Sequence, residues 1–170
     1  QLSPAPGGPR AGVSVAACGG LLYIIGGNTV DGRAQSHLDV VDVYDPQSGQ
    51  WQSGTPFPYP VQGTNAVSRN GLLYVFGGHR QDLPEAESYL CDSHVFDPQV
   101  GRWERLAPML TRRESMGITA LGDDQIFTCG GHHNLGESAA DHYSDATEIY
   151  DIESDSWMRE APLPERKSWL

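Results

Sequence analysis

The sequence predicts an all-β chain made of three consecutive copies of one four-stranded antiparallel unit. A glycine pair recurs with steps of 51 and 53 residues (77 − 26 = 51 and 130 − 77 = 53), and each pair is followed by an aromatic-Asp dipeptide and then by a tryptophan. The recurring residues are Gly26, Gly27, Gly77, Gly78, Gly130 and Gly131, then Tyr44, Phe96 and Tyr150, and then Trp51, Trp103 and Trp157. A period near fifty residues is typical of a tandem array of structural repeats.

The spacing shows which parts of the repeat have a fixed length. The tryptophan follows the aromatic residue by seven positions in every copy, and a proline follows the tryptophan by five. The blocks 12–27, 63–78 and 116–131 are expected to align without a gap. Length variation should then occur in two places, after the glycine pair and after the proline.

The first two strands of each repeat are expected to form a hairpin. The first strands are predicted at 12–16, 64–67 and 117–120, and the second at 21–25, 72–76 and 125–129. Between them stand Gly19-Gly20, Asn70-Gly71 and Asp123-Asp124. These residue types tolerate the positive φ of a tight hairpin turn.

The third strand is predicted to end at the aromatic-Asp pair, and the fourth to begin at the tryptophan. The Asp-Pro sequences at 45–46 and 97–98 favour a tight turn between them, because Asp caps turns and Pro presets φ. Since strand direction alternates, the constant turns should lie at one rim of the sheets. The variable loops should lie at the opposite rim.

The recurring residues themselves are best explained by packing. A glycine pair at the end of a buried strand permits torsions and close backbone approach that a Cβ would obstruct. The aromatic and the tryptophan are large apolar wedges suited to the space between neighbouring sheets. We therefore assign none of them a chemical role.

This combination of glycine pair, aromatic, tryptophan and proline, repeated three times, resembles the kelch repeat. The resemblance covers residues 12–168 and implies a β-propeller of four-stranded blades. The third copy departs from the pattern at Asp123-Asp124 and at Ile152. The link at 108–113 and the short turns look most like the kelch domains of BTB-kelch adaptors, which recruit substrates to cullin-based ubiquitin ligases.

The predicted organisation is one blade per repeat. Residues 1–11 are expected to end a preceding blade, 12–62, 63–115 and 116–168 to form three blades, and 169–170 to start the next one. Propellers typically close with four to eight blades, so three leave two sheet faces without a neighbour. We expect the chain to be part of a six-bladed ring, or else two copies to pair as a homodimer that completes one.

Composition limits the classes of partner. A formal net charge of −11 and a pI near 4.7 argue against binding to nucleic acid, which needs a basic surface. No apolar run approaches the ~20 residues that span a bilayer, so no membrane segment is expected. Three cysteines and the absence of a glycosylation sequon favour a reducing, cytoplasmic location over a disulfide framework.

The variable rim is the predicted binding face, because insertions in repeat proteins collect on the side that binds. The resemblance implies that residues directly after the glycine pair, and at the start of the first strand, line this face. Those positions are Asn28, His79, Arg80, His132 and His133, with Thr64 and Ser115 as weaker candidates. Loop residues Arg33, Glu85, Tyr89, His142 and Tyr143 could extend the contact.

The expected partner is therefore a client protein or peptide, gripped as an acidic or extended segment. Arg80 suits a carboxylate of the partner, because its guanidinium can donate two parallel hydrogen bonds. In this hypothesis the chain is an interaction module and not an enzyme. A BTB domain outside it would recruit the cullin.

Catalysis and cofactor binding have weaker support. His132 and His133 are adjacent and should point to opposite sides of an extended backbone, so no metal site is predicted. Neither Asp123-Asp124 nor the Glu85 and Glu87 pair has an apolar setting that would raise a carboxyl pKa for acid-base work, and no cofactor motif is present. The alternative function is a carbohydrate-related enzyme or a sugar-binding kelch propeller, whose sites assemble from distant blades.

Overall fold

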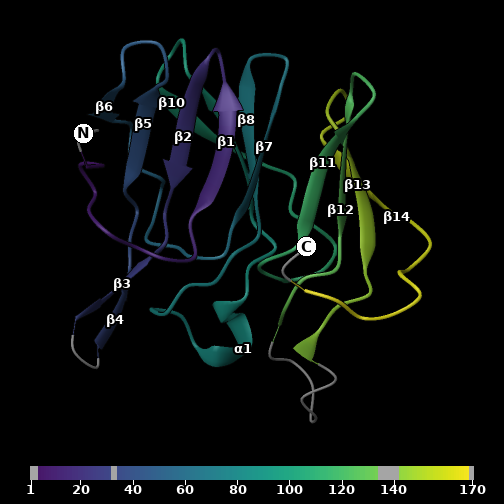
Figure 1. The fold of residues 1–170 in the computed structure, drawn as a ribbon. Coiled ribbons are helices and arrows are strands. Elements are labelled where there is room, and N and C mark those ends of the chain that lie inside the picture. Colours follow the sequence, from purple (N-terminus) through teal and green to yellow (C-terminus); the bar gives the residue numbers. More distant parts are fainter. Residues whose placement is uncertain (1–3, 32–33, 134–141, 169–170) are drawn as a thin grey trace.

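A computed structural model describes residues 4–31, 34–133 and 142–168. It contains three four-stranded antiparallel sheets side by side and one two-stranded hairpin (Figure 1). We call the three sheets the first, second and third blade. The first blade has the order β1-β2-β5-β6, the second β10-β9-β8-β7 and the third β11-β12-β13-β14, while β3 pairs with β4. The all-β prediction is confirmed.

The strands of the first blade and its hairpin are β1 (Ser14–Cys18), β2 (Leu21–Ile25), β3 (Asn28–Asp31), β4 (Ala34–His37), β5 (Val41–Asp45) and β6 (Gln50–Ser53). The second blade has β7 (Asn65–Arg69), β8 (Leu72–Phe76), β9 (Ser93–Asp97) and β10 (Arg102–Leu106), with the short helix α1 (Glu85–Ser88) in its long loop. The third blade has β11 (Gly117–Leu121), β12 (Gln125–Cys129), β13 (Thr147–Asp151) and β14 (Ser156–Arg159). The second strands agree with the predicted ranges residue for residue, and the third strands end at the predicted aromatic-Asp pairs.

The turn prediction is wrong for the third hairpin. The two-residue turns Gly19-Gly20 and Asn70-Gly71 have positive φ at both positions, as expected. In the third blade Leu121 pairs with Gln125, which leaves a three-residue turn, and its positive φ of 61° falls on Gly122 and not on the two aspartates. A glycine takes the left-handed conformation at low steric cost, so the aspartates need not.

This extra residue also shifts the repeat alignment by one position. The gap-free block beginning at Met116 is wrong, because Ser115 occupies the place of Gly12 and Gly63. The amide of Gly63 donates to Gly12 O, the amide of Ser115 donates to Gly63 O, both at 2.8 Å, and the φ angles are 63°, 63° and 52°. Length therefore varies at a third place in the repeat.

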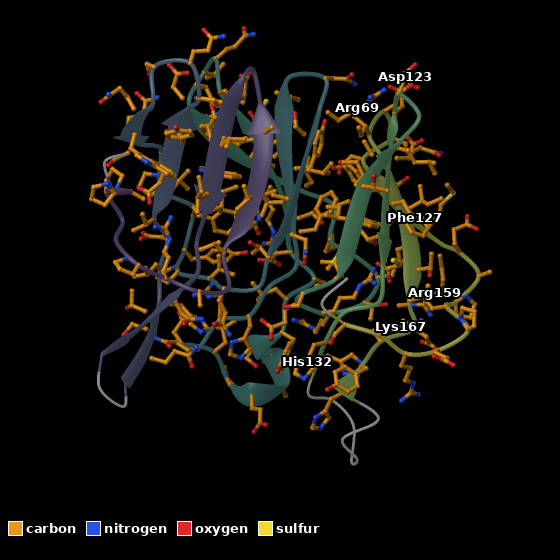
Figure 2. The ribbon with its side chains drawn as sticks, viewed as in Figure 1. Arg69, Asp123, Phe127, His132, Arg159 and Lys167 are labelled. Carbon is orange, nitrogen blue, oxygen red and sulfur yellow. The ribbon has the colours of Figure 1, made fainter. Side chains whose placement is uncertain are left out.

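Short turns lie at one rim of the blades and longer loops at the other, as the spacing predicts. Figure 1 shows the β1–β2 and β5–β6 turns at the upper rim, while the β3–β4 hairpin and α1 lie at the lower one. Figure 2 places Arg69 and Asp123 together at the upper rim, where they form an ion pair between the second and third blades, and His132 at the lower rim. We call the lower rim, formed by residues 28–31, 34–39, 79–92, 132–133 and 142–145, the loop rim.

The hydrophobic core consists of two clusters, one at each contact between blades. Between the first and second blades, Tyr23 contacts Phe96 with ring centroids 6.1 Å apart. Between the second and third, Tyr74 contacts Tyr150 at the same separation. The recurring aromatics Phe96 and Tyr150 therefore act as wedges between sheets, as predicted.

Buried ion pairs fasten the link before a blade to that blade. Arg113 and Glu148 are both fully buried with 3.1 Å between them, and Arg113 also donates to Gly130 O at 2.8 Å. Arg10 and Asp42 make the equivalent pair in the first blade. In the second blade Val61 and His94 occupy these two positions. These two equivalent positions can therefore be occupied either by a buried ion pair or by a pair of residues without an ion pair.

The glycine pairs have the torsions and contacts that the sequence predicts. Gly77 and Gly78 have φ of 65° and 111°. A Cβ on Gly78 would lie 2.7 Å from Thr64 Cγ2 and 2.9 Å from Gln62 O. The amide of Gly78 donates to Arg113 O at 3.0 Å, which joins the blade to the next link. The pair therefore serves close backbone approach.

Candidate protein-interaction face

The loop rim repeats one backbone arrangement in all three blades. The residue after each glycine pair forms an antiparallel bridge with the residue three positions before the first strand of its blade, which we call the inner strand (β1, β7 and β11). Asn28 bridges Ala11, His79 bridges Gln62 and His132 bridges Glu114. On its other side the same residue pairs with His37, Tyr89 or Tyr143. These small ladders hold the side chains of three blades in register along the rim.

Aromatic and imidazole rings form a continuous row along this face. The centroid distances are 5.2 Å for His37 and His79, 4.9 Å for His79 and Tyr89, and 5.4 Å for Tyr89 and His132. His132 in turn lies 5.8 Å from Tyr143. The row therefore crosses from the first blade to the third without a break. Of the predicted site residues, it brings together His79 and His132, along with Tyr89 and Tyr143 from the predicted loop contacts.

Two predicted site residues are instead held inside the protein. Asn28 is buried, and its amide donates to the side chain of Gln62. Thr64 is also buried, and its hydroxyl lies 2.6 Å from Ser14 Oγ between the first two inner strands. Ser115 is partly exposed and occupies the positive-φ position described above. These three residues therefore support the backbone of the loop rim and offer little side-chain surface to a partner.

Arg80 is on the loop rim, but its guanidinium already has an acidic partner. Its Nε donates to Asp82 Oδ1 at 2.9 Å, and a second nitrogen contacts Asp82 Oδ2. The guanidinium carbon also lies 4.4 Å from the centre of the Tyr59 ring. A carboxylate from a partner would have to displace Asp82. The spacing of residues in the sequence does not indicate this competing contact.

His133 and residues 143–147 border a pocket of about 660 Å³. The pocket is lined by Thr111, Tyr143, Asp145, Arg159 and Arg166 as well as by His133. The amide of His133 donates to His142 O at 2.8 Å, which closes the base of the loop. Figure 2 shows Arg159 on the same lower part of the third blade. Arg33, the remaining predicted contact, lies outside the described residues.

Sequence reasoning missed Glu114, the most perturbed carboxyl of this face. Its side chain lies over Gly63, is 15% exposed, and has Oε1 3.7 Å from His132 Nδ1. Burial raises the pKa of Glu114 to about 7. Glu114 occupies the position of Gln62 in the second blade, an equivalence that becomes visible only after the alignment is shifted by one residue.

The histidines of the row are held in their neutral form. Burial lowers the pKa of His37, His79 and His132, and the neighbouring imidazoles lower those of His37 and His132 further. At neutral pH the row therefore presents uncharged rings. No group of histidine, cysteine and acidic side chains suited to a metal ion occurs within residues 4–31, 34–133 and 142–168.

The blades and rim described above are those of a kelch-type propeller. Residues 3–167 match the KLHDC2/KLHL20/DRC7 Kelch-repeats domain, and the chain belongs to this family of kelch domains. Among similar proteins, Kelch-like protein 40 of Mus musculus is 32% identical over 149 residues, covering 88% of this chain and 22% of that protein. Kelch-like ECH-associated protein 1A of Danio rerio is 31% identical over 133 residues, covering 76% and 20%.

Two further comparisons define the extent of the likeness. Kelch repeat and BTB domain-containing protein 12 of Homo sapiens is 28% identical over 149 residues. The solved structure of YjhT superposes with a TM-score of 0.82 at 20% identity, covering 98% of this chain and 57% of that one, which supports the fold alone. The chain spans about a fifth to a quarter of its curated relatives. In the described part of the chain, no helix has the length and apolarity needed to cross a membrane.

Proposed function

We propose that this chain is the client-recognition part of a substrate adaptor for a cullin-based ubiquitin ligase, and that it binds client proteins through the loop rim. The observation that carries the proposal is the row of rings from His37 to Tyr143, which joins three blades into one face. Partly exposed aromatic rings are common anchors in protein interfaces. The opposite rim consists of short turns that vary little among blades.

The relatives support the adaptor part of this proposal. One of the relatives reported above, Kelch repeat and BTB domain-containing protein 12 of Homo sapiens, is named as containing a BTB domain as well as kelch repeats. Because this chain spans only part of the relatives' length, a BTB domain that recruits a cullin would lie outside it. The kelch blades themselves would bind the client protein.

We also propose that further blades complete a ring around these three, with six in total as the expected number. Tyr23 and Tyr74 are each covered by an aromatic of the following blade. Phe127 takes the equivalent position in the third blade and borders an apolar groove of about 540 Å³ with Leu121, Ile149 and Leu163. A blade of the same protein, or the first blade of a second copy, would fit there.

The direct test is client capture with matched variants of the two rims. We expect simultaneous alanine substitution of His79, Arg80, His132 and His133 to remove bound clients from affinity capture followed by quantitative mass spectrometry. The control carries alanine at Gln47, Ser48, Gln99 and Val100, which are exposed on the opposite rim. Unchanged capture by the loop-rim variant, with both proteins folded, would refute the proposal.

A further inference from the structure

We infer that the loop rim selects a positively charged side chain, lysine or arginine, of its partner, and that Tyr89 and Glu114 receive it beside His132. This inference rests on the proposed function and names the chemistry of the client segment. It reverses the expectation, drawn from Arg80, of an acidic segment. Three structural observations support it.

The first observation is the state of the Glu114 carboxyl group. Its side chain is 85% buried (100% − 15%), and within the described part of the chain the nearest ionisable nitrogen is His132 Nδ1 at 3.7 Å. That distance is too long for a hydrogen bond. Among the described residues, no side chain donates a hydrogen bond to this carboxyl group. A largely desolvated carboxylate without a donor is costly, and a cation from a partner would supply the missing interaction.

The second observation is the position of the Tyr89 ring. Its centroid lies 4.9 Å from that of His79 and 5.4 Å from that of His132, and the ring is partly exposed. Tyr89 and Glu114 therefore flank the same imidazole. An ammonium or guanidinium group within about 6 Å of a tyrosine face is attracted by the ring's quadrupole. The ring and the carboxylate can act on one cation together.

The third observation is the charge balance around this pair. Burial, and after it the negative charges of Glu114 and Glu85, raise the pKa of Tyr89 to about 12. Of the two nearby arginines, Arg80 forms an ion pair with Asp82, and Arg112 donates to the backbone oxygen of Tyr89 at 3.3 Å. Among the described residues, neither of these arginines forms an ion pair with Glu114. At the Glu114 carboxylate, an incoming anion would meet like charge and an incoming cation opposite charge.

At the equivalent position in the second blade, the side chain does have hydrogen-bond donors. There the side-chain oxygen of Gln62 accepts hydrogen bonds from Asn28 and, at 3.3 Å, from Gln35. Replacing Glu114 by glutamine thus introduces a residue that this fold already accommodates at the same place. Glu114→Gln is therefore a suitable variant, since it removes the charge and keeps the shape.

The test uses three small probes on the whole ¹⁵N-labelled chain at pH 8. These are n-butylammonium, n-butylguanidinium and butyrate, which carry the lysine, arginine and carboxylate head groups. We expect the two cations to shift the ring signals of Tyr89 and His132 and the amide signal of Glu114 saturably in NMR spectra. Glu114→Gln should weaken this binding at least fivefold. Glu87→Gln, which removes an exposed carboxylate from α1, should leave it unchanged.

Each other outcome counts against the inference. It is refuted if butyrate binds as tightly as the cations, if no probe shifts these signals, or if Glu114→Gln binds the cations like the unsubstituted chain. A failure here combined with lost client capture by the loop-rim variant would leave the proposed function standing. Unchanged capture by that variant would instead refute the proposed function itself.

Discussion

At the scale of single residues, Glu114 links the chemistry of the loop rim to stability. Its pKa in the folded chain, about 7, exceeds the ordinary value of 4.5 because the side chain is largely buried. A group whose pKa is raised on folding stabilises the fold fully below its unfolded pKa, and this stability is lost as the pH rises through the folded pKa. The loss should therefore occur between about pH 4.5 and pH 7.

Glu114→Gln should remove this pH-dependent loss. A difference of about 2.5 pKa units corresponds to roughly 3 kcal/mol, so the variant should gain about that much free energy of unfolding at pH 8 and little at pH 4.5. Urea unfolding at the two pH values measures the gain. Glu87→Gln, at an exposed position, is the control. Equal effects of Glu114→Gln at both pH values would contradict the assigned burial.

The buried pair of Arg113 and Glu148 gives a second residue-scale prediction. Arg113→Val leaves Glu148 buried without its cation, and this should cost about 3–5 kcal/mol of folding free energy. The double variant Arg113→Val and Glu148→His copies the residues of the second blade, Val61 and His94, so it should lose less than the single variant. Chemical denaturation of both tests this. If the double variant lost more folding free energy than the single variant, the prediction would be wrong, and the ion pair would stabilise the link better than the uncharged pair does.

At the scale of elements, the sequence predicted the strands better than it predicted the turns. The second strands could be predicted to the residue, because the turn residues before the apolar run and the glycine pair after it determine where the strand begins and ends. The third hairpin could not, since Asp123-Asp124 and Gly122-Asp123 are both plausible turns and only the register of Leu121 with Gln125 decides between them. That one-residue shift also hid the equivalence of Glu114 with Gln62.

The glycine pair offers a test at this scale. Gly78→Ala should destabilise the chain more than Gly71→Ala, although both glycines have positive φ. Each substitution adds the strain of a left-handed alanine, of order 1 kcal/mol. Only at Gly78 would the added Cβ also overlap neighbouring atoms, at 2.7 Å from Thr64 and 2.9 Å from Gln62 O, whereas Gly71 has open space. Thermal unfolding of the two variants compares them, and equal losses would contradict the close-approach role.

The candidate site was less predictable than the strands, for a physical reason. The row of rings joins residues from three loops whose lengths differ, and sequence spacing does not show which loop residues meet. His79 and His132 could be identified because they directly follow the glycine pairs. His37, the position of Tyr89 in the row, and the Asp82 contact of Arg80 required the folded loops.

At the scale of the whole molecule, the third blade exposes a face that the other two bury. We expect the isolated 18.5 kDa chain to self-associate through the apolar groove beside Phe127. Phe127→Glu should weaken that association at least tenfold, because a charge would be buried in the contact. Sedimentation velocity over a concentration series measures it. Val100→Glu, at an exposed turn position, is the control.

A chain that stays monomeric at all concentrations would contradict this prediction. In that case the blades would not need a neighbour, and the proposal of a larger ring would lose its physical basis. Association that Phe127→Glu leaves unchanged would show that a different surface mediates it. Only the first blade's exposed face and the groove beside Phe127 are expected to complement each other.

Client binding at the loop rim can be tested by hydrogen exchange of the chain with and without a captured client, followed by mass spectrometry. We expect slower exchange at the loop rim, in residues 28–31, 79–92 and 132–133. We expect no change in the turns 46–49, 98–101 and 153–155 at the opposite rim. Protection confined to those turns, with the loop rim exchanging as in the free chain, would contradict this expectation.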